Sequence, residues 1–291
     1  MPVGFAMPCP CGARDPPAPS HGHARHFRVI RQVHWILRAT MNVPILGPSD
    51  CYIWWADPRS RPVDELAAVL SDAEAERAAG LLRPEDRRRF VTAAWLLRTV
   101  VAAQLGTDPR AVAIHRRCPD CGGAHGRPRI TGTARPLHVS VTHAGDRVAV
   151  AVCAAEVGVD VEQISEAEIS RSSLAPGEWA ALRALPPYRR RAGFAAMWVR
   201  KEAALKATGH GLRVPPERVL VTGPQQPPEL LAWPLDVPPR AVTLHTLDPG
   251  EGYVGAVAVI SEGRPVNVSE YDVTRLDPAY HTTVHRSRRG A

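Results

Sequence analysis

Three side chains that could act on a phosphorylated substrate lie close together in the segment FAAMWVRKEAALKATGHGL, residues 194–212. They are Lys201, Glu202 and Lys206. Lys201 and Lys206 are the only lysines of the chain, and all the other residues among the 36 Lys and Arg are arginines. A lysine supplies a compact, flexible point charge that an arginine fork does not, so this bias indicates sites that need an ammonium group. The segment is rich in strong helix formers and ends at Gly209, which predicts a helix with Glu202 and Lys206 on one face. A solvent-exposed ion pair one turn apart would explain these two residues equally well.

A second acidic element, Gly158-Val159-Asp160-Val161-Glu162, precedes this helix along the chain. In a strand, successive side chains point to opposite faces, so Asp160 and Glu162 would share the face opposite the two valines. Paired carboxylates are suited to Mg²⁺, which prefers oxygen ligands and is held by few carboxylates together with substrate phosphates. Glu202 could supply a third carboxylate from the helix.

The order and spacing of these two motifs resemble a known family. G-V-D-V-E followed by W-x-x-K-E-A-x-x-K and G-x-G-L is similar to the Sfp-type 4′-phosphopantetheinyl transferases, and the segment Val139-Ser140-Val141-Thr142-His143 also fits that pattern. The resemblance extends from Tyr52 to Ile260 and covers neither end of the chain. At the end of this segment, the chain has Thr142-His143 where the family more often has Ser-His-Ser.

The resemblance implies a fold, a reaction and a cofactor. The fold would be α+β, with two similar lobes related by a pseudo-twofold axis and coenzyme A in the cleft between them. The reaction would be Mg²⁺-dependent transfer of the 4′-phosphopantetheine group of coenzyme A to a serine of an apo acyl or peptidyl carrier protein, for polyketide or non-ribosomal peptide biosynthesis. Asp160, Glu162 and Glu202 would bind the metal, and Glu202, Lys206 and Asp160 would carry the catalysis.

The resemblance also implies a set of residues that bind the cofactor. Arg89 matches the position of an arginine that contacts the 3′-phosphate, and Arg127 belongs to a G-R-P motif that cradles the nucleotide. The full set that we predict to contact coenzyme A is Arg89, Arg127, Thr142, His143, Lys201 and Lys206. Glu178 corresponds to a glutamate that helps to order the metal site, although an acidic residue in the first turn of a helix is also favourable by itself.

Several elements must position these residues. Hydrophobic patterns and turn residues predict a strand at 51–56, helices at 63–70, from 72 onward and at 84–105, and a strand at 137–143. Residues 147–153 and 158–162, separated by a short connection, are expected to form a β-hairpin. A helix is expected from Pro176, and later strands at 218–222, 241–246 and 253–260.

We expect four regions along the chain. Residues 1–40, rich in Pro, His and Arg, are expected to be a disordered extension, and 41–155 and 156–262 the N-terminal and C-terminal lobes. Residues 263–291 are expected to be a disordered tail. The chain resembles a soluble globular protein and contains no apolar run long enough to span a bilayer.

The positive charge gives little support to a nucleic-acid-binding function. The formal net charge is +7, but residues 1–40 contribute +4 and residues 263–291 contribute +2, so the central region is nearly neutral. We therefore expect carrier proteins and coenzyme A as partners of a monomer that binds neither nucleic acid nor membrane.

The six cysteines, at positions 9, 11, 51, 118, 121 and 153, follow no recognisable signal peptide, which favours a reducing cytoplasm. Cys118, Cys121 and His125, with His115 as a further candidate, have the spacing of half a zinc site. Cys9 and Cys11 with nearby histidines form a weaker candidate. Two alternative functions thus stay open: a non-catalytic module that binds coenzyme A or carrier proteins, and a zinc-dependent domain that binds DNA or protein.

Overall fold

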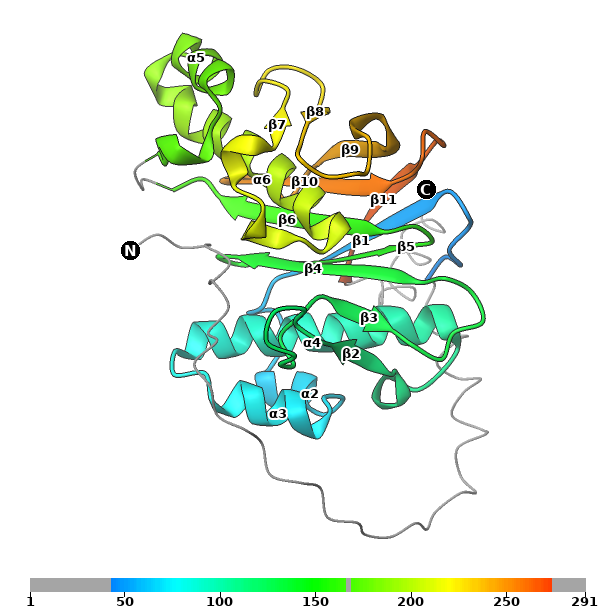
Figure 1. Ribbon diagram of the computed structural model, residues 1–291. Coiled ribbons are helices and arrows are strands. Elements are labelled where there is room, and N and C mark those ends of the chain that lie inside the picture. Colours follow the sequence, from blue (N-terminus) through cyan, green and yellow to red (C-terminus); the bar gives the residue numbers. More distant parts are fainter. Residues whose placement is uncertain (1–42, 166–168, 274–291) are drawn as a thin grey trace, which may run out of the picture.

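The computed structural model describes residues 43–165 and 169–273 (Figure 1). Two 22-residue helices, α4 (Pro84–Leu105) and α6 (Pro187–Thr208), accompany two larger β-sheets and two small hairpins. The expected α+β class is therefore confirmed. No helix in the described ranges has the length and apolar character needed to cross a membrane.

The first sheet has the strand order β11-β1-β5-β4. Its strands are β11 (Asn267–Asp272), β1 (Asp50–Ala56), β5 (Arg147–Cys153) and β4 (His138–Ala144). β1 is parallel to β11 and antiparallel to β5. The helix α4 covers one face, where Leu97 and Val101 join a core cluster with Trp54 and Val150.

The second sheet has the order β6-β10-β9, with antiparallel pairing throughout. Its strands are β6 (Val157–Gln163), β10 (Tyr253–Ile260) and β9 (Val242–Leu247). The helix α6 covers its outer face, and Ala203 and Leu205 of this helix are fully buried in a separate core cluster with Ala256 and Ala258 of β10.

The inner faces of the two sheets pack against each other. Ile53 and Trp55 of β1 form one cluster with Val159 and Val161 of β6, so each of these strands is buried on both faces. This explains why β1 is a continuous apolar and aromatic run without alternation. The layers are thus α4, first sheet, second sheet and α6, as Figure 1 shows. Because the valines of β6 face inward, its carboxylates face α6.

A seam of side-chain hydrogen bonds joins the edges of the two sheets. Ser140 Oγ accepts from the Val159 N–H at 3.1 Å, and Thr142 Oγ1 accepts from the Val161 N–H at 3.3 Å. The hydroxyls of β4 therefore satisfy edge amides of β6 that would otherwise be buried without partners.

The predicted hairpin between residues 147–153 and 158–162 is wrong. Both edges of β5 are already paired, with β1 and β4, and β6 pairs with β10 in the other sheet. The chain crosses from one sheet to the other through Ala154, Ala155 and Glu156. A short connection between two apolar runs favours a hairpin locally, but the inward-facing valines of β6 are buried better against the first sheet.

The C-terminal segment also differs from the expectation. The sequence predicts a disordered tail over the whole of residues 263–291, yet residues 267–272 form β11 and pair along the free edge of β1. The Trp55 indole donates to Glu270 at 2.8 Å, and Tyr271 stacks on Trp54. These contacts across the sequence are invisible to local patterns. The expectations for residues 1–40 and 274–291 lie outside the described residues.

The remaining elements are short. They are α2 (Val63–Ala67), α3 (Asp72–Ala79) and α5 (Pro176–Ala184), the 3₁₀ turns Pro109–Ala111, Arg171–Ser173, Gly211–Arg213, Pro216–Arg218 and Pro239–Ala241, and the hairpins of β2 (Ile114–Arg116) with β3 (Pro128–Ile130) and of β7 (Leu220–Val221) with β8 (Leu230–Ala232).

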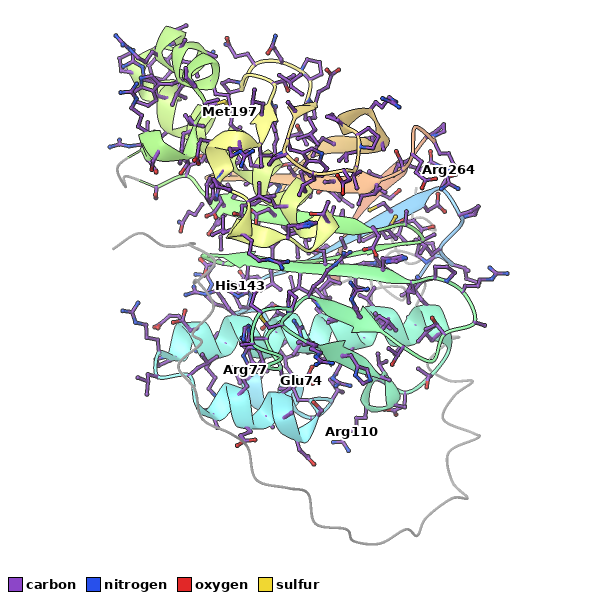
Figure 2. All side chains as sticks on the ribbon, in the orientation of Figure 1. Glu74, Arg77, Arg110, His143, Met197 and Arg264 are labelled. Atoms are coloured by element: carbon purple, nitrogen blue, oxygen red, sulfur yellow. The ribbon has the colours of Figure 1, made fainter. Side chains whose placement is uncertain are left out.

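The helix α3 begins with a capping box. Ser71 accepts from the Glu74 N–H, and Glu74 accepts from the Ser71 N–H. The same Glu74 carboxylate accepts from Arg98 of α4 at 2.6 Å, so Arg98 is a buried structural residue; Figure 2 labels Glu74 between α3 and α4.

Gly158 determines how closely α6 approaches the second sheet. A Cβ atom at position 158 would overlap the Ala203 carbonyl oxygen and the Ala207 amide nitrogen of α6. The backbones of the strand and the helix are thus in direct contact at this point. This approach brings the residues that follow Gly158 on the same face, Asp160 and Glu162, against the same helix.

We expect Gly158→Ala to lower the free energy of unfolding by about 3 kcal/mol or more, because neither backbone can move without disturbing its layer. Gly177→Ala, in the first turn of α5 with open space around its Cβ position, is the matched control and should change stability by less than about 1 kcal/mol. Urea denaturation followed by circular dichroism measures both, and equal stability of the two variants would contradict the close contact.

Candidate active site

The helix α6 supplies three residues of one face to the candidate site. Trp198, Glu202 and Lys206 follow one another at intervals of one helical turn. The helix ends where Gly209 adopts a left-handed conformation, φ 76°, which an L side chain rarely adopts. Lys206 therefore lies in the last turn, where its positive charge is also favourable to the helix dipole.

Asp160 is the centre of the site. Its carboxylate is almost fully buried, and Oδ1 accepts from Lys206 Nζ at 2.6 Å and from the Thr142 hydroxyl at 3.0 Å. Lys206 Nζ also donates to the Val159 carbonyl oxygen at 3.2 Å. The other carboxylate oxygen, Oδ2, is buried without a hydrogen-bond partner. Burying such an oxygen costs free energy unless a ligand binds to it.

Two further carboxylates crowd around Asp160. Burial and the charge of Asp160 raise the pKa of Glu162 to about 8, although Lys206 and a hydrogen bond from Trp198 lower it in part. Burial also raises the pKa of Glu202 to about 7, again with a contribution from Asp160. Glu202 Oε1 is buried without a hydrogen-bond partner. The ionised forms of these two acids are therefore not fully stabilised by hydrogen bonds or positive charges of the protein.

This donor set fits a hard divalent cation. It offers carboxylate oxygens from two elements, and two of those oxygens, Asp160 Oδ2 and Glu202 Oε1, are buried without partners. A divalent ion would favour the ionised forms of Glu162 and Glu202 and relieve their mutual repulsion. The oxygens of the three carboxylates do not, however, converge within 4.8 Å of one another, and Lys206 supplies the positive charge beside Asp160.

A cationic side lies next to the carboxylates. His143, at the end of β4, has its pKa lowered to about 4 by desolvation and by the positive charges of Lys206 and Arg89. The influence of both cations on one imidazole means that Arg89 of α4 and Lys206 of α6 face the same region. Figure 2 places His143 at β4, between the layers of α4 and α6. Carboxylates and cations side by side are the arrangement that a metal-bound phosphate would use.

The other predicted cofactor ligands have structural partners. Thr142 is buried and holds Asp160, as described above. Arg89 donates to Asp86 at 2.9 Å and to the Gly145 carbonyl at 3.2 Å. Arg127 forms an ion pair with Glu156 and donates to the Ala207 carbonyl at 2.9 Å, so it joins the end of α6 to the start of β6. Contact of these residues with a cofactor stays a prediction.

Lys201 lies away from the carboxylate cluster. It has no exposed surface, and its ammonium donates to Glu178 at 2.6 Å and to the carbonyls of Ser173 and Pro216 at 3.0 and 2.9 Å. Glu178 in turn accepts from the Val221 amide at 2.9 Å. This pair joins α5, α6 and the segment before β7, and its donors are occupied. The placement gives no support to the predicted contact between Lys201 and the cofactor, and it gives Glu178 a structural role.

Trp198 is a member of the site that the sequence motifs did not single out. Its indole donates to Glu162 across the helix–sheet contact. The signal was available, because Trp198 stands one turn before Glu202 on the same helix face. Ser140, which supports β6 from β4, had no comparable signal in the sequence.

A second group of potential ligands lies outside this cluster. Among the residues that the structure describes, Cys118, Cys121 and His125 have ligand atoms within 4.8 Å of one another. His115, the further candidate, lies on β2 and does not belong to this group.

Comparisons with known proteins show which family the chain resembles. A family model described as the 4′-phosphopantetheinyl transferase superfamily matches residues 156–258, which include Asp160, Glu202 and Lys206. The chain is 30% identical over 222 residues to the 4′-phosphopantetheinyl transferase HetI of Nostoc sp., covering 72% of this chain and 87% of the relative. It is 26% identical over 154 residues to a 4′-phosphopantetheinyl transferase of Bacillus subtilis, covering 52% and 66% of the two chains. It is also 26% identical over 194 residues to the 4′-phosphopantetheinyl transferase psf-1 of Bacillus pumilus, covering 65% and 79%.

The raised pKa values of Glu162 and Glu202 predict a pH-dependent stability of the metal-free protein. The folded chain binds more protons at these sites than the unfolded chain between the ordinary value of 4.5 and about 8, so their contribution to the free energy of unfolding falls as the pH rises through that window. Mg²⁺ should stabilise the protein more at pH 8 than at pH 6, because it binds the ionised acids. Thermal unfolding with EDTA or Mg²⁺ measures both effects.

The control is the double variant Glu162→Gln/Glu202→Gln, which removes both titrations. The difference between wild type and this variant isolates the two acids from all the other titratable groups of the protein. Parallel curves for the two proteins would contradict the raised pKa values.

The buried Lys201–Glu178 pair predicts a large loss of stability when one partner is neutralised. Glu178→Gln leaves the ammonium of Lys201 buried without a counter-charge and should cost about 3–5 kcal/mol. Glu262→Gln makes the same chemical change in the pair Arg264–Glu262, whose side chains are both 73% exposed, and should cost less than about 1 kcal/mol. Urea denaturation of both variants decides, and equal losses would show that the buried pair is not structural.

Proposed function

Because this chain belongs to the 4′-phosphopantetheinyl transferase superfamily, we propose that it transfers the 4′-phosphopantetheine group of coenzyme A to a serine of an apo carrier protein, with Mg²⁺ bound by Asp160, Glu162 and Glu202. The observation that carries the metal assignment is the pair of buried, unpartnered oxygens on Asp160 and Glu202. Family membership carries the transfer reaction itself.

The reaction determines what the site must supply. The serine Oγ forms a bond to the β-phosphorus of coenzyme A, the bond from that phosphorus to the bridging oxygen breaks, and adenosine 3′,5′-bisphosphate leaves. The serine proton passes to a base. Negative charge accumulates on phosphoryl oxygens, so the protein acts mainly by positioning and by electrostatic stabilisation. A bound Mg²⁺ supplies positive charge at the pyrophosphate oxygens.

The residues of the cluster divide these tasks. Lys206, held against Asp160 at 2.6 Å and 27% exposed, presents its ammonium to the phosphoryl oxygens as a point charge. Thr142 and Trp198 hold Asp160 and Glu162 in place. The carboxylate of Glu202, which the bound metal would keep ionised, is also the candidate base for the serine hydroxyl, directly or through a water.

The residues on the cationic side of the cluster bind the rest of the nucleotide. His143 and Arg89 lie next to Lys206 and bind the phosphates of coenzyme A, with Arg89 as the partner of the 3′-phosphate. His143 contributes imidazole nitrogens that can hydrogen-bond to a phosphate oxygen. Arg127 binds the nucleotide near the end of α6, beside the Ala207 carbonyl that it already contacts.

The two halves of the chain form lobes related by a pseudo-twofold axis, with coenzyme A between them. Support comes from their similar construction, since each large sheet carries one 22-residue helix on its outer face. The protein acts as a cytoplasmic monomer on carriers of polyketide or non-ribosomal peptide assembly. This last assignment rests on the Sfp-type motifs alone.

A non-catalytic module that binds coenzyme A or carriers is the alternative. It would use Arg89, Arg127 and His143, but it would have no reason to gather three carboxylates, two of them buried, around one lysine. Desolvation in this cluster raises the pKa values of Glu162 and Glu202. The cost of that cluster therefore favours an enzyme.

We expect the purified protein, with Mg²⁺ and coenzyme A, to increase the mass of an apo carrier protein by about 340 Da, the mass of the transferred group. EDTA should abolish the reaction. Mass spectrometry of apo carriers from polyketide, peptide and fatty-acid systems tests both the reaction and the carrier preference. A protein that binds coenzyme A but modifies none of these carriers would support the non-catalytic alternative.

The matched variants are Glu202→Gln and Gln163→Glu. The first removes the candidate base and metal ligand and should lower turnover by on the order of 100-fold or more. The second adds a carboxylate to the exposed end of β6, outside the cluster, and should leave turnover near wild type. Equal turnover of both variants would remove Glu202 from the mechanism.

A further inference from the structure

A compact loop of two cysteines and one histidine lies outside the carboxylate cluster, between β2 and β3. Cys121 Sγ lies 3.0 Å from His125 Nε2, and the ligand atoms of Cys118, Cys121 and His125 all fall within 4.8 Å of one another. A tetrahedral zinc ion with bonds of about 2.0 Å to nitrogen and 2.3 Å to sulfur needs ligand atoms roughly 3.5–3.8 Å apart. Small side-chain adjustments would bring the three atoms to that spacing.

The backbone of this loop is already arranged around the Cys118 sulfur. The amides of Cys121 and Asp120 donate hydrogen bonds to it. The Gly122 amide donates to the Cys118 carbonyl at 2.9 Å, and the Cys118 amide donates to the Gly123 carbonyl at 2.8 Å. These bonds fold residues 118–123 into a tight turn that favours a thiolate at its first position.

Three glycines permit this conformation. Gly122 has a φ of 71°, in the left-handed region. A Cβ atom at Gly123 would press on both His125 and Cys121, and one at Gly126 would overlap the backbone of Arg117. The glycines therefore let Cys121 and His125 approach each other and let the two ends of the loop meet.

We propose that Cys118, Cys121 and His125 bind one Zn²⁺ ion, with the fourth position taken by water or by the Asp120 carboxylate, whose Oδ2 lies 3.8 Å from Cys118 Sγ. Two thiolates and an imidazole are soft and borderline ligands, which select zinc over the hard cations that carboxylates prefer. This site is separate from the magnesium site, and its existence does not depend on the transfer reaction.

The loop's contacts give the ion a consequence for the rest of the fold. Asp120 forms an ion pair with Arg213 at 3.4 Å, in the turn that follows α6. Arg127, two residues after His125, donates to the Ala207 carbonyl of α6 and forms an ion pair with Glu156. A zinc ion would thus fix the segment that joins the β2–β3 hairpin to the end of the helix carrying Glu202 and Lys206. Its role is structural, because it would hold this loop in one conformation against the end of α6.

The direct test is the metal content of the full chain, purified under reducing conditions without chelators. Mass spectrometry of the metals should find about one zinc per chain. The metal-free protein should take up Co²⁺ and show the visible bands of a tetrahedral site and the near-ultraviolet charge transfer of thiolate ligands. Cys121→Ser and His125→Ala should each lower the zinc content and weaken zinc binding by at least about 10-fold in competition with a chromophoric chelator.

The matched control is the double variant Cys9→Ser/Cys11→Ser, which removes the other pair of closely spaced cysteines and should keep full zinc content. Absence of zinc binding to the reduced wild-type chain would overturn the proposal, as would unchanged zinc content in the Cys121 and His125 variants. Loss of zinc in the Cys9/Cys11 control would also overturn it, since the ion would then lie elsewhere.

Discussion

The direct contact between α6 and β6 at Gly158 is the constraint on which the candidate active site depends. It places Asp160 and Glu162 of the strand against Glu202 and Lys206 of the helix. Water is largely excluded from this region, and the pKa values of Glu162 and Glu202 are raised as a result. One ammonium group satisfies one oxygen of Asp160 and leaves the other unpartnered. Stability alone would favour apolar residues here, because buried like charges are unfavourable without a counter-ion. The metal ion that we propose would supply that counter-ion.

The two lysines of the chain have different roles because their surroundings differ. Lys206 is partly exposed beside the acidic cluster, whereas Lys201 is fully enclosed and paired with Glu178. Five positions apart on one helix, they point to different neighbours. One contributes positive charge to the site, and the other fixes the helix that carries the site. The two lysines that the chain contains thus have two separate physical explanations.

The sequence by itself determined the main elements and the acidic cluster. Alternation in β6 placed the valines on one face and Asp160 and Glu162 on the other, and helical spacing placed Glu202 and Lys206 on the same side of α6. Both are local regularities with fixed periods, so they can be read without any knowledge of packing. The family resemblance then connected the strand to the helix, a relation that periodicity cannot supply.

Only the tertiary structure decided the relations between distant segments. It separated β5 and β6 into different sheets, paired the C-terminal β11 with β1, and enclosed Lys201 with Glu178. Each of these outcomes depends on which apolar faces and open strand edges are left when the whole chain has collapsed. That competition is settled by burial and hydrogen bonding summed over the molecule, and no local window of sequence contains it.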